Sequence, residues 1–167
     1  MNKLILLPLS VLAGVLLAIP ARAQSLLLGR IVSTGDGNMI KVQRRGQTQT
    51  LVLGCIDMPD VTQRTWGKLA TDRFKQLLPI GQTIQWREIT RDSYGRTIAE
   101  VFISEESINL QLVTEGMAVL YPKYIDECHT AKAEYLLAES EAQQQRIGLW
   151  QESKPCMPWE HRRRLCS

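Results

Sequence analysis

The chain has 167 residues, of which 20 are lysine or arginine and 17 are aspartate or glutamate. Residues 1–23 hold two of the basic residues and no acidic one, so the remainder carries a net charge of only +1. This length suits one domain with its own core, and the charge excludes a protein that attracts nucleic acid through overall basicity.

The N-terminus has the pattern of a secretory signal peptide. Lys3 precedes an apolar run over residues 4–19, and Ala21-Arg22-Ala23 fits a signal-peptidase site, which predicts cleavage after Ala23. A membrane anchor is the alternative. It is less favoured because the run is short for a bilayer span of about 20 residues and Pro20 follows it. We therefore expect a secreted or periplasmic protein with no membrane segment after cleavage.

The first part of the mature chain predicts three β-strands. Residues 25–34, 38–44 and 48–56 are rich in β-forming residues, and turn signals at residues 35–37 and 45–47 separate them. Pro59 ends the third strand because proline cannot donate a hydrogen bond to a sheet.

The rest of the chain predicts three helices and two more strands. Apolar residues at helical spacing predict a helix over residues 65–78, strands follow at 83–89 and 97–103, and helices follow at 108–115 and 126–146. Five short strands with a helix after the third predict an α+β fold, a five-stranded barrel of the OB type. Residues 24–167 should form one domain, which ends in a short tail containing cysteines and arginines.

All four cysteines lie in the mature part, where export permits disulfides. Four cysteines allow three pairings, and sequence does not choose among them. The short separation favours Cys156 with Cys166, which leaves Cys55 as a candidate free, buried thiol. A zinc site is the less favoured alternative, because the sequence has only two histidines and no C-x-x-C spacing.

Several short motifs, in this order and spacing, resemble those of the staphylococcal nuclease (thermonuclease-like) family. The matching segments are Gly35-Asp36-Gly37-Asn38, residues 53–60, Tyr94-Gly95-Arg96 with Ala99 and Val101, Gly116-Met117-Ala118, Gly148-Leu149-Trp150, and Pro158-Trp159-Glu160 with Arg162. The resemblance covers residues 30–162 and implies the same barrel. It also implies calcium-dependent endonucleolytic hydrolysis of DNA or RNA, with a single-stranded substrate and a monomeric protein expected.

The resemblance assigns roles to seven residues. Arg96 matches a catalytic arginine that contacts the phosphate, and Asp60 matches the carboxylate beside the attacking water. Calcium takes oxygen ligands, and the matching positions are Asp57, Asn38 and, through its carbonyl, Met58. Tyr94 and Tyr124 match positions that contact the nucleotide.

Two of these positions, and a further one at Val52, differ from the family pattern in ways that should weaken catalysis. Asn38 replaces a calcium aspartate and removes ligand charge, while Asp60 is one methylene shorter than the family's glutamate. Val52 stands where the family has its other catalytic arginine, and losing such an arginine can cost on the order of 10³-fold in rate. Arg44 and Arg45 lie at a neighbouring turn, where a solvated role is favoured.

Three functions remain open from the sequence. The first is a weakened exported nuclease, and the second is a non-catalytic OB barrel that binds single-stranded nucleic acid or a protein partner. The third is a hydrolase with a different metal. The run Arg162-Arg163-Arg164 favours a solvated tail over a phosphate contact.

Overall fold

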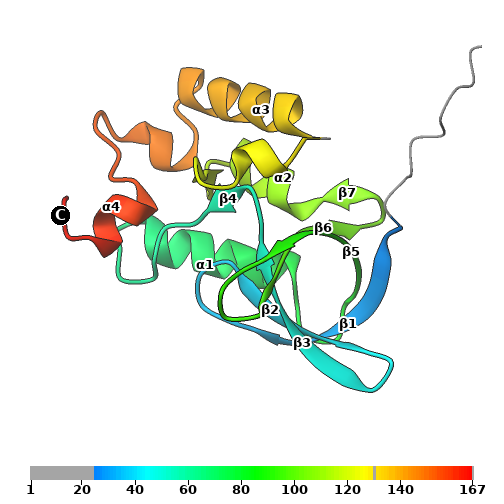
Figure 1. Cartoon of the computed structure of the whole chain (residues 1–167). Coiled ribbons are helices and arrows are strands. Elements are labelled where there is room, and N and C mark those ends of the chain that lie inside the picture. The colour runs from blue at the N-terminus through cyan, green and yellow to red at the C-terminus, as the bar shows by residue number, and fades with distance from the viewer. Residues whose placement is uncertain (1–24, 130, 167) are drawn as a thin grey trace, which may run out of the picture.

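The computed structural model describes residues 25–129 and 131–166, and the predicted signal peptide lies outside the described residues. Five strands form the barrel predicted from the sequence (Figure 1). They are β1 (Leu27–Thr34), β2 (Met39–Arg44), β3 (Gln47–Leu53), β5 (Thr83–Arg91) and β6 (Thr97–Ile103). Neighbours pair antiparallel in the order β3-β2-β1-β5-β6, and a parallel pairing of β3 with β6 closes the barrel. The α+β barrel prediction is confirmed.

Strand periodicity explains which side chains fill the barrel. Successive side chains of a strand point to opposite faces, and the inward positions here are apolar while the alternate positions are more exposed. The buried members include Ile31, Ile40, Val42, Leu51, Leu53, Ile84, Trp86, Ala99 and Val101.

Helices cover one side of the barrel, with α1 (Trp66–Leu77), α2 (Ile108–Thr114) and α3 (Lys132–Gln144) as the longest. On α1, Trp66, Ala70 and Phe74 recur every four residues and form its buried face. The shorter elements are β4 (Ile56–Asp57), β7 (Glu106–Ser107), β8 (Val119–Leu120), η1 (Ile125–Glu127), η2 (Gly148–Gln151) and α4 (Pro158–Arg162).

The predicted helix over residues 126–146 is wrong at its start. The chain forms the 3-10 helix η1, breaks, and begins α3 only at Lys132. Cys128 ends η1 with a ψ of 41°, outside the helical region. It is also tied to Cys55 by a disulfide, which holds this segment against the barrel.

Both disulfides join described cysteines. Cys156 pairs with Cys166, as favoured from the sequence. Cys55 pairs with Cys128, so the expectation of a free thiol at Cys55 is wrong. Local spacing could not reveal this second pair because its cysteines lie 73 residues apart in sequence.

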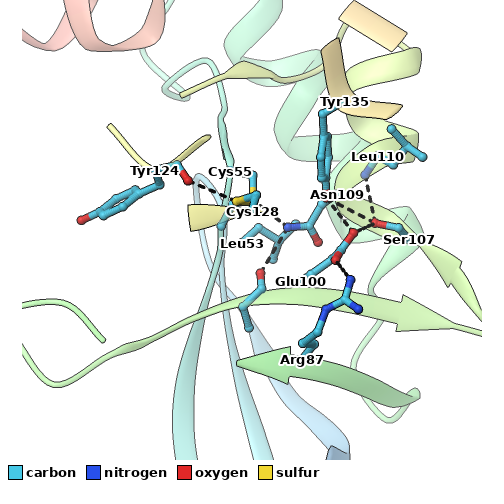
Figure 2. The surroundings of a disulfide bond; sticks show 12 residues. Leu53, Cys55, Arg87, Glu100, Ser107, Asn109, Leu110, Tyr124, Cys128 and Tyr135 are labelled. Carbon is cyan, nitrogen blue, oxygen red and sulfur yellow. Dashed lines mark hydrogen bonds and ion pairs between the residues drawn. A yellow bond between two sulfur atoms is a disulfide. The ribbon is translucent and has the colours of Figure 1, made fainter. Parts of the chain in front are cut away.

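Asn109 joins α2 to the barrel beside the Cys55–Cys128 disulfide, which we call the inner disulfide (Figure 2). Its side chain is fully buried. Its Oδ1 accepts a hydrogen bond from the Val101 N–H at 3.0 Å, and its Nδ2 donates to the carbonyls of Gly54 at 3.0 Å and Ala99 at 3.2 Å. The amide satisfies backbone groups where β3 leaves the barrel and so fixes the path of the chain towards β4.

Two glycines bring the end of α2 against the end of α3. Gly116 and Gly148 have φ values of 62° and 56°, and a Cβ on either one would run into the backbone of the other segment. The Leu149 N–H donates to the Gly116 carbonyl at 3.0 Å across this approach. Within residues 25–129 and 131–166, no helix is long and apolar enough to cross a membrane.

Candidate active site

One cavity of about 530 Å³ gathers most of the predicted site residues. Its wall comes from the turn before β2, the end of β3, β4, the turn between β5 and β6, the segment after β8, and α4. The predicted site residues that line it are Asn38, Asp57, Asp60, Arg96 and Tyr124. Val52 lines the same cavity, so the position that lacks the family's arginine does face the candidate site.

Arg96 is held in the cavity by the turn between β5 and β6. Asp92 Oδ1 accepts hydrogen bonds from the backbone N–H groups of Tyr94 and Arg96, both at 2.9 Å. Asp92 Oδ2 accepts from Arg96 Nε at 2.6 Å. The Tyr94 ring lies 5.2 Å from the guanidinium carbon. Arg96 is therefore oriented by its own turn, and its unused N–H groups remain available to a ligand.

Asp57 lies on β4, which pairs with β8 at the edge of the cavity. Its side chain is largely buried, and this burial raises the pKa of its carboxyl group, although hydrogen bonds from Arg162 and the Met58 backbone act in the opposite direction. Arg162 Nη1 donates to Asp57 Oδ1 at 3.2 Å, and Nη2 donates to Oδ2. Both carboxylate oxygens are thus engaged by one guanidinium.

Asp60 caps the loop that leads to α1. Its Oδ1 accepts from the Thr62 N–H at 3.1 Å and from the Thr62 hydroxyl at 2.9 Å. The backbone hydrogen bond from Thr62 lowers the pKa of Asp60 and outweighs the opposing effect of partial burial. Thr62 Oγ1 also lies 3.1 Å from His161 Nε2 of α4. Asp60 is therefore ionised and lies at the edge of the cavity, where it could accept a proton or orient a water molecule.

The donor set does not fit calcium as it is arranged. Calcium prefers several oxygen ligands, with carboxylates prominent among them. Asp57 is occupied by Arg162, and Asp36 pairs at 3.0 Å with Lys75. Asn38 uses its Nδ2 to donate to the Leu53 carbonyl at 3.2 Å. Among the described residues, no three histidine, cysteine, aspartate or glutamate side chains converge to hold a metal ion.

Two predicted site residues lie away from the cavity lining. The Met58 side chain is buried in the core, and Tyr94 is 83% exposed. Lys123 was not among the predicted site residues, but it lines the cavity with Tyr121 and Tyr124. The Tyr121 and Tyr124 rings pack edge to face with centroids 5.6 Å apart. The aromatic rings that line the cavity therefore lie after β8, while the exposed Tyr94 ring lies against Arg96 outside the lining.

Arg162 is the main site residue that sequence reasoning missed. The expectation of a solvated arginine tail is wrong for this residue, because α4 places its guanidinium on Asp57. Burial lowers the pKa of Arg162, but its hydrogen bonds and attraction to Asp57 outweigh this effect and raise it. Figure 1 shows α4 beside the loop that leads into α1, although the two segments are far apart in sequence. A weak signal for α4 was present, since Pro158 occupies its first turn and Glu160 accepts from the Met157 N–H at 3.1 Å.

Comparisons with known proteins agree with this fold. Residues 49–152 match the family model described as "Staphylococcal nuclease homologue". An "Uncharacterized endonuclease" of Escherichia coli is 31% identical over 137 residues, which cover 81% of this chain and 85% of that protein. A "Micrococcal nuclease" of Shigella flexneri is 33% identical over 163 residues, which cover 92% and 91% of the two chains. A "Thermonuclease" of Staphylococcus intermedius is 28% identical over 140 residues, 78% of each chain. The chain therefore belongs to the staphylococcal nuclease family.

Proposed function

We propose that this protein is an exported nuclease that binds single-stranded DNA or RNA in the cavity and cleaves it slowly. The observation that carries the proposal is the convergence of Arg96, Asp57 and Asp60 on one cavity. An arginine is suited to bidentate contact with a phosphate, and a nearby ionised carboxylate can orient or deprotonate a water molecule. The names of the relatives point to the same chemistry. Export rests on the signal-peptide pattern of residues 1–23.

Each group would act at a defined place. The unused N–H groups of Arg96 would donate to the phosphate oxygens, where charge develops during hydrolysis. Asp60 would hold the attacking water, and the Tyr121 and Tyr124 rings would stack on bases without sequence preference. Val52 can offer nothing to the phosphate. We therefore expect a rate on the order of 10³-fold below that of a family member with both arginines.

Calcium is the cofactor that the family resemblance implies, and the arrangement around Asp57 does not favour it. A bound calcium ion would need Arg162 to leave the carboxylate, and Asn38 offers a neutral ligand in place of a carboxylate. The roles given to Arg96 and Asp60 do not depend on a metal, and the cleavage assay tests the calcium requirement directly.

The test is hydrolysis of fluorescently labelled single-stranded DNA and RNA by the purified protein. Parallel reactions contain calcium, other divalent metals, or a chelator, and Arg96→Ala is run beside the wild type. Slow cleavage that Arg96→Ala reduces at least tenfold is expected from the loss of a transition-state contact. Equal cleavage by both proteins would show a contaminating nuclease and remove the proposal.

A second function is favoured by one specific observation. The cavity lacks an arginine at Val52, and the carboxylate of Asp57 is already neutralised by Arg162. This combination suits a barrel that binds single-stranded nucleic acid without cutting it. Tight binding with no cleavage under any metal condition would favour this function over the first.

A further inference from the structure

The tail after η2 is fastened to the body of the protein at several places. The Cys156–Cys166 disulfide closes the segment that contains α4. Gln63 Nε2 donates to the Cys156 carbonyl at 2.7 Å, and the Thr62 hydroxyl contacts His161 at 3.1 Å. Both partners lie in the loop between β4 and α1, next to Asp60. The tail therefore has a fixed position relative to the cavity.

An aromatic contact fastens the other face of α4. The Trp159 ring stacks on the Tyr121 ring, with centroids 5.8 Å apart. Trp159 and Met157 also pack against a buried cluster formed by Trp66, Val119 and Leu149. Because Arg162 follows Trp159 by three residues on the same short helix, this packing directs its side chain towards Asp57.

The guanidinium of Arg162 keeps donors free while it binds Asp57. An arginine has five N–H donors, and the pairing with Asp57 is made end-on through Nη1 and Nη2. Three N–H groups therefore remain. The Arg162 side chain is 43% exposed, whereas Asp57 is only 9% exposed, so the free donors are accessible from the cavity and the carboxylate is covered.

The cavity carries balanced charge with Arg162 present. Asp57, Asp60 and Asp92 face Arg162, Arg96 and Lys123, while the carboxylate of Asp36 is engaged by Lys75. Without Arg162 the same cavity would carry excess negative charge and would repel a phosphodiester. Arg162 is thus one of three cations that make this cavity acceptable to an anion.

We propose that Arg162 is a phosphate-binding residue that the tail contributes to the cavity. It acts as the cation at Asp57 and supplies the second guanidinium that Val52 does not provide, so that the cavity holds a phosphodiester of single-stranded nucleic acid without a metal ion. This rests on the proposed function, since it names a further contact in the same cavity. Arg163 and Arg164 do not share the role, because neither lines this cavity.

The test is the affinity of the protein for a fluorescein-labelled oligothymidylate of about 12 nucleotides, measured by anisotropy in excess EDTA. Arg162→Gln should weaken binding at least tenfold, because a charge-assisted phosphate contact is lost. Arg163→Gln is the matched control and should bind within about twofold of the wild type, because Arg163 is exposed and outside the cavity. Arg96→Gln tests the cavity itself and should also weaken binding.

Two double variants separate the loss of the phosphate contact from the change in net charge and from any loss of folding. Arg162→Gln with Asp57→Asn restores the charge balance and removes the unpaired buried carboxylate, and it should still bind weakly. Recovery of wild-type affinity in this variant would overturn the proposal, since net charge alone would then explain the effect. Arg162→Gln with Val52→Arg should regain most of the affinity, because a guanidinium returns to the same cavity.

The outcomes distinguish this proposal from the proposed function. Wild-type affinity in Arg162→Gln, together with weakened binding in Arg96→Gln, would overturn the role of Arg162 and leave the cavity as the binding site. Wild-type affinity in both variants would remove the cavity as the site and with it the proposed function. In a parallel titration with calcium in place of EDTA, binding that appears only with calcium and strengthens in Arg162→Gln would make Arg162 a competitor of calcium for Asp57, which also overturns the proposal.

Discussion

Two buried polar side chains each form a junction between separate segments of this protein, and the hydrogen-bond partners at the two junctions differ in kind. Asn109, between α2 and the barrel, is fully buried and bonded to backbone groups of Gly54, Ala99 and Val101. Asp57, at the cavity, is nearly as buried but is bonded to a charged side chain 105 residues away. Backbone partners have no further donors to offer, whereas the guanidinium from the tail keeps N–H groups that a ligand can use. The first junction therefore fixes the fold, and the second is where a ligand can act.

The largest expected effect is on the inner disulfide. Replacing both Cys55 and Cys128 by alanine should lower the free energy of unfolding by about 4 kcal/mol, because the bond constrains a long loop in the unfolded chain. The separation of 73 residues sets this value well above that for the tail disulfide. Urea denaturation of both disulfide variants checks it, and equal losses would contradict this dependence on loop length.

The next effect in size is at Asn109. Asn109→Ala removes the partner of the Val101 N–H and of the Gly54 carbonyl in a dry interior, while the Ala99 carbonyl keeps its hydrogen bond from the Gly54 N–H, and it should lower the free energy of unfolding by about 3 kcal/mol. The midpoint of chemical denaturation measures this loss. Because Asn109 does not line the cavity, the folded variant should bind oligothymidylate as the wild type does.

Removing the tail disulfide should lower the affinity more than the stability, which is the reverse of the result expected at Asn109. Replacing Cys156 and Cys166 by alanine loosens α4, so the affinity for oligothymidylate in EDTA should fall about tenfold, equivalent to about 1.4 kcal/mol. The barrel does not depend on this bond, and the main unfolding transition should move little. A large loss of global stability with unchanged affinity would show that the tail supports the fold and not the cavity.

The smallest effect is at Glu139 on α3. Its Oε1 accepts from the Leu120 N–H at 2.7 Å, and burial raises its pKa despite that bond. Protonation is therefore more favourable in the folded than in the unfolded state, and its contribution to stability is complete below the unfolded-state pKa of about 4.5 and is lost as the pH rises through the folded-state pKa. Glu139→Gln should raise stability at pH 7 by under about 1 kcal/mol, and the gain should vanish below pH 4. Thermal melts at the two pH values check this.

The barrel could be predicted because its signals are local. Alternating apolar residues in β2 and β3, the turn glycines, and Pro59 act within a few residues of one another. The convergence of Asp57, Asp60 and Arg96 could also be predicted, because the family motifs carry their relative positions. The short loop between Cys156 and Cys166 allowed that disulfide to be favoured as well.

The missed features depend on contacts between distant segments. Cys55 meets Cys128 only because α2 and the segment after β8 fold onto the end of β3. The helix α4 has five residues, too few for a periodic pattern, and its N-cap is Met157, which is not a usual capping residue. The partnership of Arg162 with Asp57 joins residues 105 positions apart and had no signal in either segment alone.

The stacking of Trp159 on Tyr121 gives the tail an optical reporter. Trp86 is buried in the barrel and should emit as a shielded indole throughout, while Trp159 lies at the joint between α4 and the cavity wall and packs against the cluster that contains Trp66. If α4 leaves the wall, this indole enters water and its fluorescence shifts to longer wavelength. Tail attachment can thus be followed in the unlabelled protein, during ligand titration or disulfide reduction, by the colour of its own tryptophan emission.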